Sequence, residues 1–183
     1  MNIKVWGILG AGFLSLAFIP SVSVLFTILG LIFTGIALNA LSKNEKVFNY
    51  FLIASLLSFI ATMLFYFKLI AVITSFVLGL FSNNPVVPIG FSILIYFTIY
   101  YVLQIVSAVY FKKSFYLLGE EYNNRYLKIA GNFLIAGAVL NIFAIGLIVS
   151  VIGWLLILIG FVTIEEIINA EIIEEEKFLE NKN

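Results

Sequence analysis

Four long blocks of this chain carry no charged residue, and they limit its possible folds more than any other feature. They cover residues 5–42, 47–67, 69–111 and 129–164. A helix crosses a bilayer in about 20 apolar residues, because each residue advances about 1.5 Å through a hydrocarbon core of about 30 Å. The chain is 63% hydrophobic and 11% charged, whereas a soluble domain has about 25% charged residues. The sequence therefore predicts an all-α polytopic transmembrane helical bundle.

The lengths of the blocks and the positions of the charges predict six helices. We expect them at about 4–19, 22–41, 47–67, 91–113, 128–146 and 150–168. The first is interpreted as a helix that is retained, rather than as a signal peptide. This division places nine of the ten basic residues on one side: Lys4, Lys43, Lys46, Lys112, Lys113, Arg125, Lys128, Lys177 and Lys182. The positive-inside bias makes that side cytoplasmic, together with both termini, in the cell membrane.

Two connections are less regular than the others. Residues 68–90 are more than the third and fourth helices need to cross the membrane. We expect them to form an outer segment in the interface, as a bent extension of the third helix. A re-entrant loop is the alternative. Turn formers gather only at its end, from Ser82 to Gly90. In the last block, Gly146, Ser150 and Gly153 suggest the bend of a hairpin.

The residue types that are missing exclude much chemistry. The chain has no Cys, no His and no Asp. It therefore lacks thiol nucleophiles, thiolate metal sites and the usual neutral-pH proton acceptor. All ten Glu lie at or beyond the expected membrane ends. We therefore expect no catalytic residue, no cofactor site and no metal site, and the protein is predicted not to be an enzyme.

A few uncharged polar residues fall inside the expected crossings. In the fourth helix, Tyr96, Tyr100, Gln104, Ser107 and Phe111 recur every three or four residues and so share a face. The candidate intramembrane polar cluster consists of Tyr100, Gln104, Asn132 and Asn141. Such groups either line a solute path or form hydrogen bonds between helices, and the second use is the more frequent one.

Small residues at four-residue spacing suggest close helix packing. The pairs are Gly7 with Ala11, Gly30 with Thr34, and Gly146 with Ser150. The first and last hairpins also share a glycine interval, because Gly35 follows Gly12 as Gly160 follows Gly137. The interval leaves a duplication and chance agreement equally open.

Although the net charge is zero, the acidic and basic residues are unevenly distributed along the chain. Residues 165–183 carry seven Glu and two Lys, a net charge of −5, whereas residues 1–164 carry a net charge of +5. We expect residues 169–183 to form an acidic, helical cytoplasmic tail. The tail either docks on a cytoplasmic partner or remains solvated.

Four segments carry a family resemblance, namely Ile36–Ser42, Tyr110–Leu118, Ala130-Gly131 and Ala136-Gly137-Ala138. They are similar to an uncharacterised family of small multi-spanning membrane proteins found mainly in archaea. The resemblance covers nearly the whole chain and implies a prokaryotic, archaeal cell membrane. It implies no activity, because the family has none assigned.

These features predict a non-catalytic integral membrane protein, an accessory or scaffold subunit that packs against membrane lipid and other membrane subunits or further copies of itself. No nucleic acid partner is expected. The alternative is a facilitator or channel for a small solute, which a water-filled cavity reaching Gln104 would favour. A lipid-modifying enzyme is a third hypothesis, with Glu120, Glu121, Lys112 and Lys113 as the dense interfacial candidates.

Overall fold

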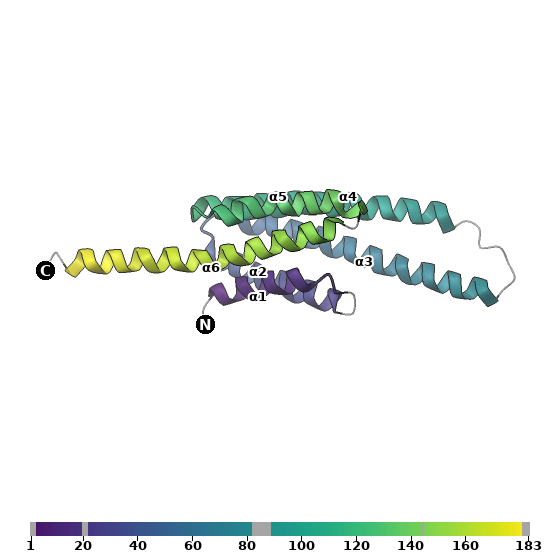
Figure 1. The fold of residues 1–183 in the computed structure, drawn as a ribbon, viewed down its shortest axis with the longest axis horizontal. Helices are drawn as coiled ribbons and strands as arrows, with labels where there is room; N and C mark the ends of the chain where they lie inside the picture. The colour runs from purple at the N-terminus through teal and green to yellow at the C-terminus, as the bar shows by residue number, and fades with distance from the viewer. Residues whose placement is uncertain (1–2, 20–21, 82–88, 144, 181–183) are drawn as a thin grey trace.

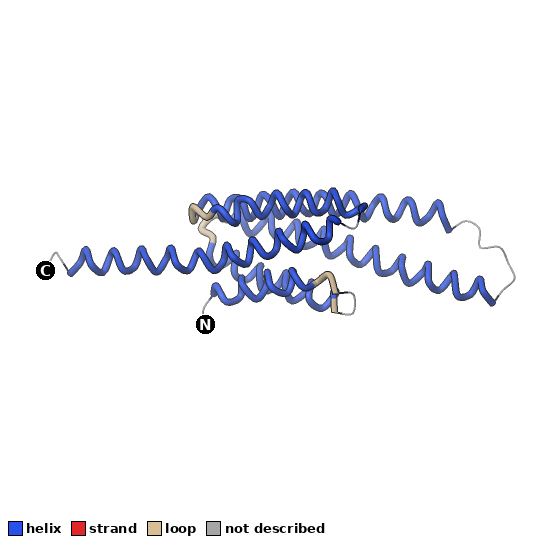
Figure 2. Tube along the Cα trace, in the orientation of Figure 1, coloured by secondary structure: helices blue, strands red, loops and turns tan. Residues whose placement is uncertain are grey.

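The computed structural model describes residues 3–19, 22–81, 89–143 and 145–180 (Figure 1). All regular structure within these ranges is helical (Figure 2). The elements are α1 (Ile3–Leu16), α2 (Ser23–Leu41), α3 (Glu45–Phe81), α4 (Ile89–Glu121), α5 (Arg125–Leu140), the 3-10 helix η1 (Asn141–Phe143) and α6 (Ile145–Glu180). The predicted all-α fold with six α-helices is confirmed.

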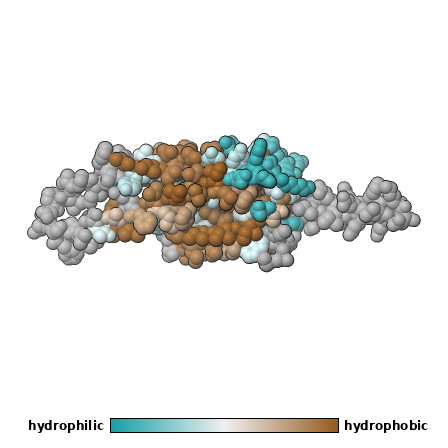
Figure 3. Space-filling view, turned by 180° about the vertical axis from the view of Figure 1, so that it is seen from behind, coloured by the Kyte–Doolittle hydropathy of each residue, from teal (hydrophilic) through white to brown (hydrophobic). Residues whose placement is uncertain are grey.

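Five of the described helices are long and apolar enough to cross a membrane. The spans are Ser23–Leu41, Glu45–Thr74, Ile95–Glu121, Arg125–Phe143 and Ile145–Ile164. α1 is shorter, because its 14 residues advance only about 21 Å. Figure 3 shows hydrophobic residues over the middle of the bundle, with hydrophilic ones gathered at one end. This is the architecture of a multi-pass membrane protein.

The helices form a ring in chain order. Each packs against the next one along the chain, and α1 packs against α6. Two serines of α4 fix its register on α3: Ser107 Oγ donates to the carbonyl of Ala54, and Ser114 Oγ donates to the carbonyl of Val47, each at 2.8 Å. Lys46 and Lys112 therefore lie at the same end of the bundle. We call this the basic end, and it carries Lys43, Lys46, Lys112, Lys113, Arg125 and Lys128.

α3 and α4 are longer than the sequence indicated. The expected outer segment at 68–90 continues α3 as a helix through Phe81 and is helical again from Ile89. Its place in the interface, and the re-entrant alternative, stay predictions. Residues 68–81 contain no proline, and the dense run of turn formers begins at Ser82. The segment 82–88 lies outside the described residues. The α3–α4 hairpin projects beyond the other helices at the end away from the basic end (Figure 1).

The last hairpin bends earlier than expected. α5 ends at Leu140, and α6 has begun by Ile145, so Gly146, Ser150 and Gly153 lie within α6 rather than at the bend. A side chain on Gly137 of α5 would collide with Gly146 and Ser150. These small residues therefore bring two helix backbones into contact. They do not form a turn.

The two helices of the first hairpin also pack closely at small residues. A side chain on Gly10 of α1 would collide with Gly30 and Thr34 of α2. The predicted packing of these small residues is thus confirmed in both hairpins. The glycines that share an interval do not share a packing role. A Cβ on Gly137 would collide with α6, whereas a Cβ on Gly12 would meet only Leu158 at 3.8 Å. The contacts give the shared interval no support.

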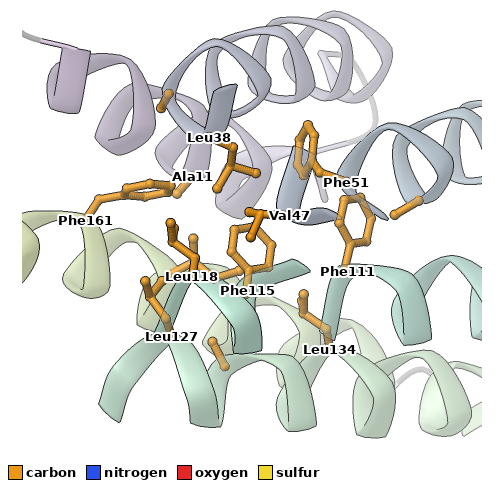
Figure 4. Packing of buried hydrophobic residues seen from close by; sticks show 14 of the residues in the cluster. Ala11, Leu38, Val47, Phe51, Phe111, Phe115, Leu118, Leu127, Leu134 and Phe161 are labelled. Atoms are coloured by element: carbon orange, nitrogen blue, oxygen red, sulfur yellow. The ribbon is translucent and has the colours of Figure 1, made fainter. Parts of the chain in front are cut away.

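The buried core lies toward the basic end. Phe51, Phe115, Leu118, Leu127 and Phe161 are all nearly or fully buried there (Figure 4). The turn between α4 and α5 is tied to this core by Asn124, which accepts from the backbone N–H of Tyr126 and Leu127. Its Nδ2 also donates to the carbonyl of Gly160 in α6 at 2.9 Å. An N-cap in this position fixes where α5 begins.

The glycine contacts predict unequal effects of the same added methyl group. Gly137→Ala should lower the free energy of unfolding by about 1–3 kcal/mol, because an inserted methyl group has no space between closely packed helices. Gly12→Ala is the matched control and should leave stability almost unchanged, since its methyl group makes only an ordinary contact with Leu158. Unfolding in mixed micelles, followed by the fluorescence of Trp6 and Trp154, measures both. Equal stabilities of the two variants would contradict the packing described here.

Candidate functional site

A cavity of about 240 Å³ lies within the ring of helices. Its walls come from α1 and the turn after it, and from α3, α4, α5, η1 and α6. The polar residues that line it are Ser58, Tyr100, Gln104, Ser107, Asn141 and Ser150. The cavity is therefore a polar space inside an otherwise apolar bundle.

Tyr100 and Asn141 join two sides of the cavity. Asn141 Nδ2 donates to the Tyr100 hydroxyl at 3.2 Å. The neighbouring Tyr101 hydroxyl donates to the carbonyl of Val139 at 2.8 Å, which fixes α4 against the end of α5. The ring of Phe65 packs on Tyr100 with 5.2 Å between ring centroids. The hydrogen-bonded pair is thus held in place from α3, α4 and α5.

Gln104 lies one helical turn from Tyr100 and lines the same cavity. Its amide forms no hydrogen bond with any residue that the structure describes. The hydroxyl of Ser107, by contrast, is committed to the carbonyl of Ala54. Gln104 therefore offers both a donor and an acceptor to a guest in the cavity.

Aromatic rings close the cavity toward the basic end. The ring of Trp154 meets Phe111 at 5.3 Å and Phe115 at 5.9 Å between centroids, both edge-to-face. Phe51 packs on Phe111 at 5.6 Å and on Phe115 at 6.2 Å. We call these four rings the aromatic plug. Edge-to-face pairs are favourable beyond the apolar area that they bury, so the plug is a stable closure.

A second cavity, of about 520 Å³, adjoins the first. The two share Phe18, Tyr100, Asn141 and Leu147 as lining residues. The second cavity also reaches Ser23, the first residue of α2, and Ile142 in η1. Both residues lie at the end opposite the basic end. The two adjacent cavities therefore lie between that end and the rings of Phe111 and Trp154, and Gln104 lines the one nearer the basic end.

The structure brings together three of the four residues predicted for the polar cluster. Tyr100, Gln104 and Asn141 line the cavity, whereas Asn132 is exposed on α5 and belongs to neither cavity. Asn132 was included because it is polar and lies within the expected fifth helix, but it lies on the outer side of α5. Ser150 was missed as a lining residue because its spacing from Gly146 indicated packing, a role that it also has. Trp154 was missed because a lone aromatic residue in an apolar helix gives no signal.

The charged residues proposed for lipid chemistry do not form one site. Glu121 accepts from the hydroxyl of Ser42 at 2.8 Å and from the backbone N–H of Lys43 at 2.7 Å. Glu120 and Glu121 line a surface groove with Lys43 and Lys46. Lys113 instead lies over the rings of Tyr50 and Tyr110, at 5.6 and 5.3 Å from their centroids. Within the described residues, no group of three or more potential ligands among His, Cys, Asp and Glu is suited to a metal ion.

The fold and the cavities define a multi-pass helical membrane protein with a polar space inside its bundle. Residues 26–155 match a family described as a protein of unknown function, DUF996, and the chain belongs to this family. The expected membership of an uncharacterised family is confirmed. The matched range contains every cavity-lining residue named above except Phe18 and Ser23. No curated protein and no solved structure matches the chain.

Proposed function

We propose that the protein is a non-catalytic facilitator that binds a small neutral polar solute and lets it cross the membrane. The observation that supports this proposal most directly is the cavity lined by Gln104. A cavity at this residue is the feature that distinguishes the facilitator from the accessory subunit also predicted from the sequence. The facilitator is therefore our first candidate.

The lining groups select the class of solute. Tyr100 and Asn141 are paired with each other, whereas the Gln104 amide offers a donor and an acceptor in the cavity, which the hydroxyls of Ser58 and Ser150 also line. None of the described lining residues carries a carboxylate, ammonium or guanidinium group. A charged guest would lose its hydration without gaining a counter-charge, which is costly in a low-dielectric interior. Small alcohols, amides and water fit this chemistry.

The route has one open side and one closed side. A solute enters through the second cavity, passes Tyr100 and reaches Gln104. Further passage requires the rings of Phe111 and Trp154 to move apart, because they close the cavity toward the basic end. The proposed facilitator thus has a gate at these two rings, which are packed on each other in the structure.

Flux measurements with a single amide change test the proposal. Proteoliposomes of the purified chain should take up glycerol or urea faster than protein-free vesicles, as followed by light scattering after rapid mixing. Gln104→Leu should reduce this protein-dependent rate about tenfold, because a lost hydrogen bond at a desolvated site costs about 1–2 kcal/mol.

Asn132→Leu is the matched control, since it removes an amide from the outer surface of α5. It should transport as the parent chain does. An absence of protein-dependent flux with glycerol, urea and water would refute the facilitator. Equal rates for the two variants would refute the role of Gln104.

We also propose an orientation for the protein. The basic end faces the cytoplasm of the cell that contains this protein, with both termini on that side, because basic residues gather there. The resemblance noted above suggests that this cell is archaeal. Since the chain has no cysteine, single-cysteine variants report sidedness cleanly.

Cysteines at Lys43 and Lys113 should react with an impermeant maleimide only after intact cells are opened. A cysteine at Phe18, near the opposite end, should react in intact cells. Reaction at Lys43 and Lys113 from different sides of the membrane would contradict the arrangement of α3 and α4.

An accessory or scaffold subunit is the second candidate, and the α3–α4 hairpin favours it. α3 has 37 residues, which corresponds to about 55 Å against a hydrocarbon core of about 30 Å. Its projecting part exposes apolar side chains, with Phe67 71% and Ile70 59% exposed. Another membrane subunit or a further copy would cover this surface. The acidic end of α6 offers a separate contact to a cytoplasmic partner.

Purification from native membranes in mild detergent distinguishes this second candidate. If the protein is a subunit, it should elute with other chains in fixed ratio, and Phe67→Ser should release them without unfolding the bundle. Elution as a single chain under all mild conditions would contradict the subunit. Either result leaves the flux measurement as an independent test of the facilitator.

A further inference from the structure

Two lysines pack reciprocally across the seam between α4 and α5 at the basic end. A Cβ on Gly131 of α5 would lie 2.8 Å from Lys112 Cγ, and a Cβ on Gly119 of α4 would lie 2.9 Å from Lys128 Cγ. Each glycine therefore makes space for the stem of a lysine on the other helix. The first atoms of both side chains are fixed by this packing.

The two lysines occur at the edge of the seam. Both are half-buried, whereas Gly119 and Gly131 beneath them are buried. Lysines commonly lay their alkyl stems on an apolar surface and keep the ammonium group at its polar boundary. Lys128 is three residues from Gly131 on α5, so the two lysines lie about one helical turn apart along the seam. The stems of the two lysines thus lie on one seam.

The charges of this pair are not neutralised by the described part of the chain. No described carboxylate comes within 4 Å of Lys112 or Lys128, which is the limit for an ion pair. The other lysines of the basic end differ in this respect. Lys43 and Lys46 share a groove with Glu45, Glu120 and Glu121, and Lys113 lies over two tyrosine rings.

The position of the pair identifies its partner. Lys112 belongs to the candidate span Ile95–Glu121 of α4 and Lys128 to the candidate span Arg125–Phe143 of α5, each in the part nearer the basic end. We therefore expect both ammonium groups to reach the lipid headgroups. Basic pockets between transmembrane helices on the cytoplasmic side bind anionic headgroups. The acidic end of the same chain is directed elsewhere, since α6 leaves the basic end as one helix and points away from the bundle (Figure 1).

We propose that Lys112 and Lys128 form a binding site for the phosphate of an anionic phospholipid in the leaflet at the basic end. We call this the lysine clamp. The phosphate lies between the two ammonium groups, and the lipid chains continue along the outer surface of α4 and α5. The site is independent of the internal cavity and of any solute that the cavity takes.

Native mass spectrometry in detergent, with added phosphatidylglycerol or phosphatidylcholine, tests the clamp. The parent chain should retain phosphatidylglycerol in preference to phosphatidylcholine. Lys112→Gln combined with Lys128→Gln should weaken phosphatidylglycerol binding about 10- to 30-fold, because each basic residue near an anionic headgroup contributes a factor of about three to five. Glutamine keeps much of each stem, so the packing on Gly119 and Gly131 is retained.

Lys43→Gln combined with Lys46→Gln is the matched control, with the same change in net charge at the same end. It should bind phosphatidylglycerol as the parent chain does. Equal weakening in both double variants would show that net charge alone attracts the lipid, and would overturn the clamp. Loss of a dimer in the Lys112/Lys128 variant, with lipid binding unchanged, would assign the lysines to the tail of a second copy and also overturn it. Inorganic phosphate that displaces phosphatidylglycerol at millimolar concentration would overturn the lipid as the partner.

Discussion

The structure depends on one constraint: hydrocarbon offers no hydrogen bonds, so polar groups inside the bundle need partners within the protein. Four of the hydroxyl groups meet this need with a backbone carbonyl of another helix. Ser107 and Ser114 do so between α4 and α3, and Tyr101 does so between α4 and α5. The hydroxyl of Tyr122 similarly donates to the carbonyl of Leu41 at 2.7 Å. These bonds fix the register of the ring.

Gln104 forms no such hydrogen bond with a described residue, and this makes the cavity that it lines a candidate binding site. A long amide side chain without a described partner is costly in an apolar interior unless water or a solute satisfies it. The bundle is divided accordingly. Most of the large buried side chains lie near the basic end, and the cavities lie toward the other end. The aromatic plug lies between the two regions, and this division is the basis of the proposed gated facilitator.

The sequence predicted the features that follow from local composition and failed where they depend on packing. Uncharged blocks predicted the helices, and basic residues predicted that Lys46 and Lys112 share an end. Gly146 and Ser150 suggested a bend, because a small residue can serve either in a turn or in a contact between helices. Only the packing of Gly137 against them shows that they serve in a contact. Asn132 was grouped with Gln104 because polarity does not reveal which side of α5 faces inward. The length of α3 was underestimated because an apolar segment beyond the membrane thickness was expected to bend onto the outer surface or to re-enter the bundle.

The central claim is that the polar cavity opens at one end of the bundle only. The side of the membrane from which position 104 can be chemically modified tests this claim most directly. Because the chain has no native cysteine, Gln104→Cys supplies a single reporter at the inner end of the cavity, and Phe115→Cys supplies a buried control behind the plug. In oriented proteoliposomes, a small impermeant thiosulfonate should modify the cysteine at 104 from the side opposite the lysines and leave the cysteine at 115 unmodified from either side. Modification at 104 from the lysine side alone, or from neither side, would contradict a polar cavity that opens at one end and is closed by aromatic rings at the other.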